Sequence, residues 1–145
     1  IVPRFEPRNQ FEYYSLRSGQ THDLEHIVCG GGFDIIGELV PYYARLSNVP
    51  RFLDPELTGY INAGQLLGSL RVVTRAGLHY QQSFPTALKA MRHGMDVGEQ
   101  SGPFFMAKYE DVFHLSVADA RETLGIRGAI DLDSRDASLV WPEYS

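Results

Sequence analysis

Three consecutive glycines, Gly30-Gly31-Gly32, interrupt a helical stretch and place the strongest constraint on how this chain folds. Consecutive glycines favour a helix end because they reach left-handed backbone angles without steric cost. Just before them, His22 and His26 are four residues apart, so both imidazoles lie on one helix face. On one continuous helix, Glu38 would lie about 18 Å along the axis from His26. A reversal at the glycines instead predicts two antiparallel helices that bring Glu38 back beside the histidines.

The residue types in this cluster are typical of a metal site. Histidines at positions i and i+4 of one helix commonly share a metal ion. Asp23 lies about 100° around the helix from His22, where it would add a ligand or orient an imidazole. The sequence therefore predicts that His22, Asp23, His26 and Glu38 bind a divalent metal. A solvated helix end with two surface histidines is the alternative interpretation.

The ligand set also narrows the choice of ion. Two imidazoles with one or two carboxylates leave a coordination position open, as catalytic rather than structural zinc sites do. Such mixed nitrogen and oxygen ligands suit Zn²⁺, Fe²⁺ or Mn²⁺ better than Mg²⁺, although metal availability can override this preference. The single cysteine, Cys29, is interpreted as a small core residue rather than a further ligand.

Helical periodicity dominates the chain, and no segment shows a convincing strand alternation. Thr21 is expected to cap the helix that carries the histidines. Asp54-Pro55-Glu56 is the strongest helix start, with a capping aspartate and a proline at the first helical position. Pro41 predicts a kink or an early proline in its helix. The expected helices span residues 11–17, 21–29, 34–46, 54–82, 86–95 and 116–125.

These elements predict an all-α fold, a single-domain bundle of about five to six helices over residues 1–145. Residues 126–145 are weakly patterned, and we expect a surface tail held at most by Val140 and Trp141. Because the chain has no initiating methionine, we expect a fragment or the ordered part of a longer protein.

Composition excludes several classes of protein. Thirteen basic against eighteen acidic residues leave no excess of positive charge, which argues against a nucleic-acid binder. One cysteine excludes a disulfide framework and favours a reducing, cytosolic compartment. No apolar run approaches the roughly 18 residues that span a bilayer. We therefore expect a soluble or membrane-peripheral protein.

The metal pattern also carries a family resemblance. His22-Asp23-x-x-His26, eleven residues and then Glu38 resembles the signature of the fourth coenzyme Q biosynthesis protein family, the Coq-four proteins. Gly37-Glu38-Leu39-Val40 resembles the family's Gly-Glu stretch. The segments 87–98 and 116–126 resemble its later helices, so that the resemblance covers roughly residues 12–126.

This resemblance implies an all-helical, membrane-peripheral and often dimeric protein that works with other quinone-biosynthesis enzymes. Its implied cofactor is a divalent metal, zinc first, held by His22, Asp23, His26 and Glu38, with Fe, Mn or Mg as alternatives. The implied reaction is oxidative decarboxylation of a polyprenyl hydroxybenzoate. In a bacterium such a protein would lie in the cytoplasm at the inner membrane, and in a eukaryote on the matrix side of the mitochondrial inner membrane.

A polyprenyl ligand needs an apolar groove and a partner for its head. The helix expected over residues 54–82 carries small residues spaced along its length, including Gly59, Ala63 and Gly68, among several leucines. Such residues suit close helix packing, including a dimer seam, or a lipid groove between helices. Arg71 and Arg75, again four apart, could meet an anionic head or a phosphate, with a solvated charged face as the alternative.

Three classes of function remain open at this point. The first is a metal-dependent protein of prenylated-quinone biosynthesis, and the second is a lipid-binding scaffold without turnover. The third is a metal-dependent hydrolase. A zinc peptidase needs glutamate where this chain has Asp23. A phosphohydrolase of the His-Asp type needs a further upstream histidine, and none precedes His22.

Overall fold

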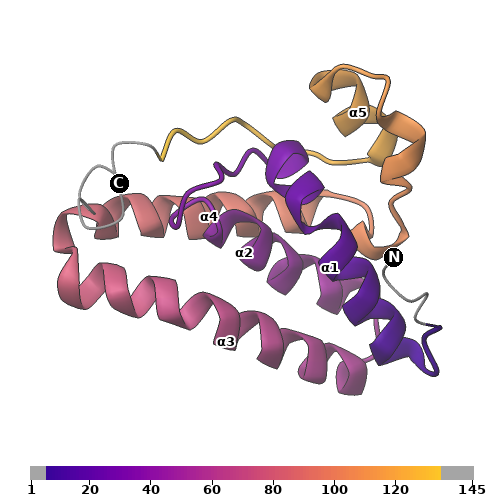
Figure 1. Cartoon of the computed structure of the whole chain (residues 1–145), viewed down its shortest axis with the longest axis horizontal. Coiled ribbons are helices and arrows are strands. Elements are labelled where there is room, and N and C mark those ends of the chain that lie inside the picture. The colour runs from indigo at the N-terminus through magenta and orange to yellow at the C-terminus, as the bar shows by residue number, and fades with distance from the viewer. Residues whose placement is uncertain (1–5, 135–145) are drawn as a thin grey trace.

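The computed structural model describes residues 6–134 and contains five α-helices over that range, with no strand. The prediction of an all-α bundle is confirmed. Four short 3₁₀ segments connect the helices (Figure 1). No helix in the described part of the chain is long and apolar enough to cross a membrane. The helices are α1 (Gln10–Cys29), α2 (Leu39–Asn48), α3 (Pro55–His79), α4 (Phe84–Gln100) and α5 (Val117–Leu124).

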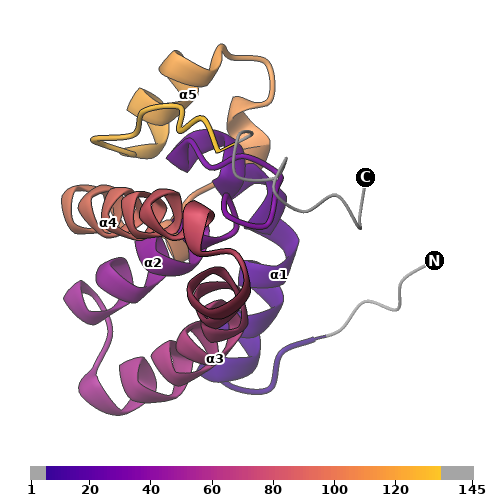
Figure 2. The ribbon, with the colours of Figure 1, turned by 90° about the vertical axis from the view of Figure 1, so that its left-hand side faces the viewer.

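Helix α2 lies at the centre of the bundle, with α1, α3 and α4 packed around it (Figure 2). Its residues Leu39, Val40 and Ala44 are fully buried. Two glycines of α4 let the backbones approach closely. A Cβ on Gly94 would lie 2.5 Å from the carbonyl oxygen of Val40, and one on Gly98 would lie 2.1 Å from that of Ala44. Both glycines lie inside α4, which ends at Gln100, five residues later than the expected end at residue 95.

Helix α1 is one continuous helix over Gln10–Cys29, so the prediction of separate helices over residues 11–17 and 21–29 is wrong. Asn9 is its cap, and its side chain accepts a hydrogen bond of 2.9 Å from the backbone N–H of Glu12. Thr21 is not a cap. It lies buried in mid-helix, where its hydroxyl donates to the carbonyl oxygen of Arg17. Burial of one face along the whole helix keeps it continuous through Gly19, although glycine is a weak helix former.

A buried ion pair fastens α1 to α2. The guanidinium of Arg45 donates to the Glu25 carboxylate at 2.6 Å and to the carbonyl oxygen of Ser18 at 2.6 Å. The hydroxyl of Thr21 donates to the other carboxylate oxygen of Glu25 at 2.8 Å. Both charged side chains are buried, and the partners they need come from the protein itself.

The remaining helix ends follow local signals closely. The Asp54 side chain accepts from the backbone N–H groups of Glu56 and Leu57, and α3 is the longest described helix, as predicted. It ends at His79, three residues earlier than expected. Ser116 caps α5, and Gly125 follows its last residue with a φ of 71°. Helix α2 begins at Leu39 rather than at residue 34, so Pro41 falls in its first turn and causes no kink.

The segment after α5 packs against the protein over its described length. Ile126, Leu132 and Ser134 are buried, and the N–H of Leu132 donates to the carbonyl oxygen of Gly30 at 2.8 Å. Residues 126–134 thus lie on the surface, as expected, but they are anchored by contacts that the sequence did not predict. The predicted contacts of Val140 and Trp141 lie outside the described residues.

Candidate metal centre

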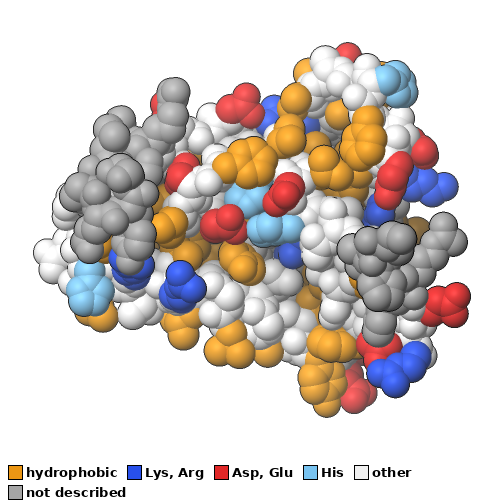
Figure 3. Space-filling view, viewed as in Figure 1, with side chains coloured by type: hydrophobic (Ala, Val, Ile, Leu, Met, Phe, Trp, Pro, Cys, Tyr) orange, Lys and Arg blue, Asp and Glu red, His pale blue; other side chains and the backbone are white. Residues whose placement is uncertain are grey.

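The structure brings three of the four predicted ligands together at the end of α1. His22 and His26 come from that helix, and Glu38 immediately precedes α2. One ligand atom from each of these residues lies within 4.8 Å of the other two. The Glu38 carboxylate contacts Nε2 of His22 at 3.0 Å and Nε2 of His26 at 3.4 Å. Figure 3 shows histidine side chains flanked by acidic ones near the middle of this face of the molecule.

Asp23 does not join this cluster. Its side chain is exposed, and it is absent from the metal-binding group found among the described residues. One step along a helix turns a side chain by about 100°, which carries Asp23 away from the face that His22 and His26 share. The geometry therefore supports a three-residue ligand set.

The glycine turn allows Glu38 to return to the histidines because the backbone doubles back on itself. Gly30 ends α1 with a φ of 81°, a conformation that favours glycine. Farther along, the two arms of the loop touch through their backbones. A Cβ on Gly37 would lie 2.0 Å from the carbonyl oxygen of Gly32, so no side chain is tolerated there without movement.

Asp34 holds this turn in place. Its Oδ1 accepts hydrogen bonds from the backbone N–H groups of Ile36 at 3.0 Å and Gly37 at 2.9 Å. Its other carboxylate oxygen accepts a hydrogen bond from the Ser134 hydroxyl. These contacts fix the backbone just before Glu38 and so determine where its carboxylate points.

The loop also orients His26. Its Nδ1 donates to the carbonyl oxygen of Gly32 at 2.9 Å, which assigns the proton to Nδ1 and leaves Nε2 facing Glu38. Phe33 stacks on the imidazole, with ring centroids 5.1 Å apart. The His26 side chain is only 1% exposed, whereas that of Glu38 is 36% exposed. The cluster is thus rigid on one side and open to a ligand on the other.

The electrostatics of the cluster suit a cation. Hydrogen bonds from His22 and His26 lower the pKa of Glu38 to about 2, so the carboxylate is charged at neutral pH. For His26, burial lowers the pKa, but the hydrogen bond and charge of Glu38 outweigh it and the net pKa is raised. Two imidazole nitrogens and a charged carboxylate form a donor set that fits Zn²⁺, Fe²⁺ or Mn²⁺.

A cavity of about 200 Å³ adjoins Glu38 and lies between the start of α2 and the C-terminal half of α3. Arg71 and Arg75 line it, so the structure places both predicted head-group residues near the cluster. Arg75 also contacts Tyr80, whose hydroxyl lies 3.4 Å from its guanidinium. The other lining residues are Ile35, Tyr42, Gly68 and Val72.

Tyr42 is a site residue that sequence reasoning missed. It follows Glu38 by four residues, and its ring centroid lies 6.0 Å from that of His22. A Cβ on Gly68 would lie 2.7 Å from the Tyr42 ring, so the glycine makes room for it. The helical spacing from Glu38 was the signal that could have identified this residue.

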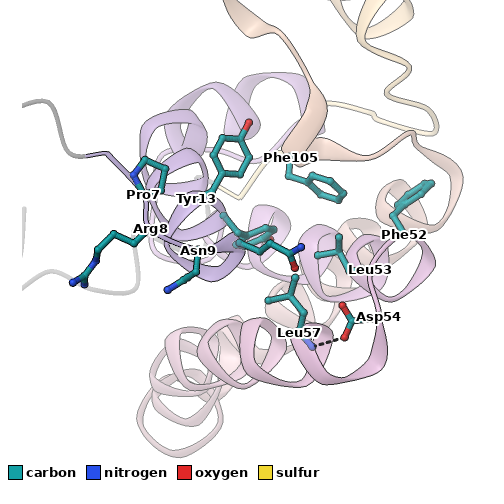
Figure 4. Close-up of a pocket in the computed structure, with 11 residues that line it drawn as sticks. Pro7, Arg8, Asn9, Tyr13, Phe52, Leu53, Asp54, Leu57 and Phe105 are labelled. Carbon is teal, nitrogen blue, oxygen red and sulfur yellow. Dashed lines mark hydrogen bonds between the residues drawn. The ribbon is translucent and has the colours of Figure 1, made fainter.

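A second, larger cavity of about 580 Å³ lies at the other end of α1 (Figure 4). Its walls include Tyr13, Phe52, Leu57 and Phe105. Tyr13 precedes His22 by nine residues, or about 14 Å of helix. The two charged side chains that line this cavity have partners in the protein, because Arg8 pairs with Glu12 and Asp54 caps α3. The cavity therefore suits an uncharged apolar group.

No protein-family model matches this chain, and no curated protein matches it either. Among solved structures, the chain is similar to a "putative ubiquinone biosynthesis protein" from Nostoc punctiforme PCC 73102, with a TM-score of 0.64 and 21% sequence identity. The match covers 88% of this chain and 55% of that one, so the chain spans about half the length of the solved protein. At this identity the similarity shows a shared fold, and the resemblance to the Coq-four family stays a prediction.

Proposed function

We propose that this protein binds a divalent metal through His22, His26 and Glu38 and acts on a prenylated precursor in quinone biosynthesis. The observation that carries the proposal is the convergence of three ligand atoms within 4.8 Å beside a cavity lined by two arginines. The fold shared with a protein named for ubiquinone biosynthesis supports the choice of pathway. Zinc is the first candidate for the ion.

The cavity beside Glu38 suits the head of such a ligand. Arg71 and Arg75 offer positive charge to a carboxylate or phosphate, and Ile35, Tyr42 and Val72 offer apolar wall. A volume of about 200 Å³ accommodates one substituted aromatic ring rather than a long chain. The tail would need other apolar surface, for which the cavity near Tyr13 and Phe105 is a candidate.

An open ligand set favours catalysis over a purely structural metal. Three protein ligands with a vacant coordination direction are typical of catalytic zinc sites, whereas structural sites are closed by four. When bound, the ion would act as a Lewis acid toward carboxylate or ring oxygens of the ligand. The chain's own contribution is orientation. The carbonyl oxygen of Gly32 orients the His26 imidazole, and Asp34 fixes the backbone turn before Glu38. The two arginines would bind the acidic head group of the ligand.

Partners and location follow as parts of the same proposal. Phe33 and Ile35 are exposed beside the cluster, where they would let an apolar ligand enter from a membrane surface. We place the protein at such a surface together with other enzymes of the pathway. The phosphohydrolase alternative finds no support, because the described residues add no further histidine to the cluster.

The first test is metal content and affinity, measured by elemental analysis and titration for the native chain and for Glu38→Ala and His26→Ala. The proposal requires one tightly bound ion per chain and its loss in both variants. Asp23→Ala is the matched control and should retain the ion. An ion that survives the loss of Glu38 would contradict the three-residue site.

A second assay separates an enzyme from a scaffold. The metal-loaded protein is incubated with a prenylated hydroxybenzoic acid and an electron acceptor, and release of carbon dioxide is measured. Release that depends on Glu38 supports decarboxylation. Tight binding of the prenylated acid without release, weakened by Arg71→Ala, supports the scaffold role instead.

A further inference from the structure

Tyr42 lines the cavity beside Glu38 and carries a hydroxyl group close to its wall. The tyrosine ring lies against α3 at Gly68. A Cβ added to that glycine would be 2.7 Å from a ring carbon and 3.0 Å from the hydroxyl oxygen. On its other side the ring faces the metal cluster, with its centroid 6.0 Å from that of His22. Gly68 thus fixes the position of a polar group between the cluster and α3.

The hydroxyl of Tyr42 has no partner among the described residues. No hydrogen bond joins it to any group of residues 6–134. It differs in this from the hydroxyl of Tyr80, which contacts the Arg75 guanidinium. It also differs from the hydroxyl of Tyr109, which is enclosed in the core. Because Tyr42 is only partly buried and its hydroxyl is not enclosed, a ligand in the cavity can reach this group.

Two contacts define how the walls of the cavity face each other. The side-chain amide of Asn62 donates to the carbonyl oxygen of Leu46 at 3.1 Å. Farther along α3, Gly68 meets Tyr42. Moving back along α2 therefore corresponds to moving forward along α3, so the two helices pack antiparallel (Figure 1).

This register orders the polar groups of the cavity. Continued by one helical turn, it sets Glu38 level with Arg71, and Arg75 lies a further turn along α3. Gly68 and Arg75 are seven residues apart, or about 10 Å along the helix axis. The cavity therefore has the Tyr42 hydroxyl toward one end and positive charge toward the other, with the metal cluster beside it.

We propose that the Tyr42 hydroxyl is a specificity-determining group that donates a hydrogen bond to an oxygen on the ring of the ligand head. This role rests on the proposed function, in which Arg71 and Arg75 hold the acid group of that head. A ring held there by its acid group presents its opposite edge to Tyr42. A ring without an oxygen at that edge leaves the hydroxyl unpaired, so it binds more weakly.

Tyr42→Phe tests this role, because it removes the hydroxyl and keeps the ring that fits against Gly68. The native chain and the variant, each with an equivalent amount of zinc, are titrated calorimetrically with para-hydroxybenzoate and with benzoate. Benzoate lacks the oxygen opposite the acid. The variant should bind para-hydroxybenzoate about three- to tenfold more weakly, as expected for one neutral hydrogen bond. Its affinity for benzoate, and its affinity for zinc alone, should equal those of the native chain.

The adjacent tyrosine supplies a matched control. Tyr43 packs against the hydrophobic core and does not line the cavity. Tyr43→Phe also removes one hydroxyl from α2, and it should bind both acids as the native chain does. Circular dichroism checks that the two variants keep their helices.

A change in α3 tests the same hydroxyl from the opposite wall. Gly68→Ala should weaken binding of para-hydroxybenzoate at least as much as Tyr42→Phe does, because the added Cβ forces the Tyr42 ring aside. Gly64→Ala is the control, since nothing lies within 4 Å of its added Cβ. It should leave the affinity unchanged.

Two results would overturn the role of Tyr42, and they separate it from the proposed function. If Tyr42→Phe keeps its affinity for both acids, or loses affinity for both equally, the hydroxyl does not recognise the ring oxygen, while the head-group site stands. If the native chain holds zinc but binds neither acid, the head-group site is itself wrong and the role of Tyr42 fails with it.

Discussion

Two polar clusters join α1 to the segment around α2, and they are one residue apart in the sequence of α1. Glu25 pairs with Arg45, whereas His26 pairs with Glu38. The first cluster is closed, because both charged side chains are buried and bond to groups of the protein. The second has one buried member, His26, while His22 and Glu38 are partly exposed.

The difference teaches how to separate a structural cluster from a functional one. A charge pair that the protein itself satisfies fixes one arrangement of the helices. A charge cluster with an open side remains available to a ligand. Changes in the first cluster should therefore act on folding, and changes in the second should act on metal binding. The predictions below are ordered by the size of the expected effect.

Arg45→Met should lower the free energy of unfolding by about 3–5 kcal/mol, because it leaves the Glu25 carboxylate buried without its partner. Urea denaturation of the metal-free protein measures this. Replacing both residues, with Glu25→Leu and Arg45→Met, should recover most of the loss. If the single variant is as stable as the native chain, the ion pair does not have the structural role assigned to it.

Glu38→Gln should weaken metal binding by at least about 100-fold, or ~2.7 kcal/mol, because it removes the charged ligand. The same variant should change the stability of the metal-free protein much less than Arg45→Met does, since Glu38 is partly exposed. Isothermal titration measures the metal affinity, and urea denaturation measures the free energy of unfolding of the metal-free protein. If Glu38→Gln lowered the free energy of unfolding as much as the free energy of metal binding, the two clusters would not differ in the way proposed.

Gly37→Ala should destabilise the metal-free protein by about 1–3 kcal/mol and weaken metal binding, because its Cβ would collide with the Gly32 carbonyl. That carbonyl also accepts the hydrogen bond from His26. Gly59→Ala is the matched control, because nothing lies within 4 Å of its added Cβ. It should stabilise the helix by about 0.5–1 kcal/mol. Thermal melts and metal titration compare the two.

Asp23→Asn should change stability by no more than about 0.5 kcal/mol, as surface substitutions usually do, and should leave metal stoichiometry at one. This outcome would confine the ligand set to His22, His26 and Glu38. A loss of the ion in Asp23→Asn would instead show that Asp23 rotates into the cluster when metal binds. Elemental analysis of the purified variant gives the answer.

Local signals in the sequence predicted the parts of the fold that depend on local chemistry. The glycine turn after Cys29, the cap at Asp54 and the cap at Ser116 all form as expected. Each depends on a residue's own backbone preference or on a hydrogen bond across one turn. The position of Glu38 beside the histidines was predicted by the same reasoning. A chain that reverses direction at the glycines runs back along the helix that carries His22 and His26.

Features that depend on distant residues were not predictable in this way. Helix α1 runs through Gly19 because its buried face packs along the whole helix, which no local propensity reports. Gly98 stays helical because it faces the backbone of Ala44. The burial of Leu132 and the contact between Ser134 and Asp34 join segments that are far apart in the sequence. The cavity beside Glu38 likewise needs α2 and α3 side by side.

The contact between Ser134 and Asp34 also has a consequence for folding during translation, because it cannot form until Ser134 has been synthesised. These residues are 100 positions apart, and ribosomes add about 5–20 residues per second. Asp34 and the residues of the proposed metal site are therefore synthesised roughly 5–20 s before Ser134. Helices α1 to α4 have time to pack before Ser134 can bond to Asp34 in the loop that precedes α2. The loop that carries Glu38 would therefore gain its last described contact only after the C-terminal segment has been made.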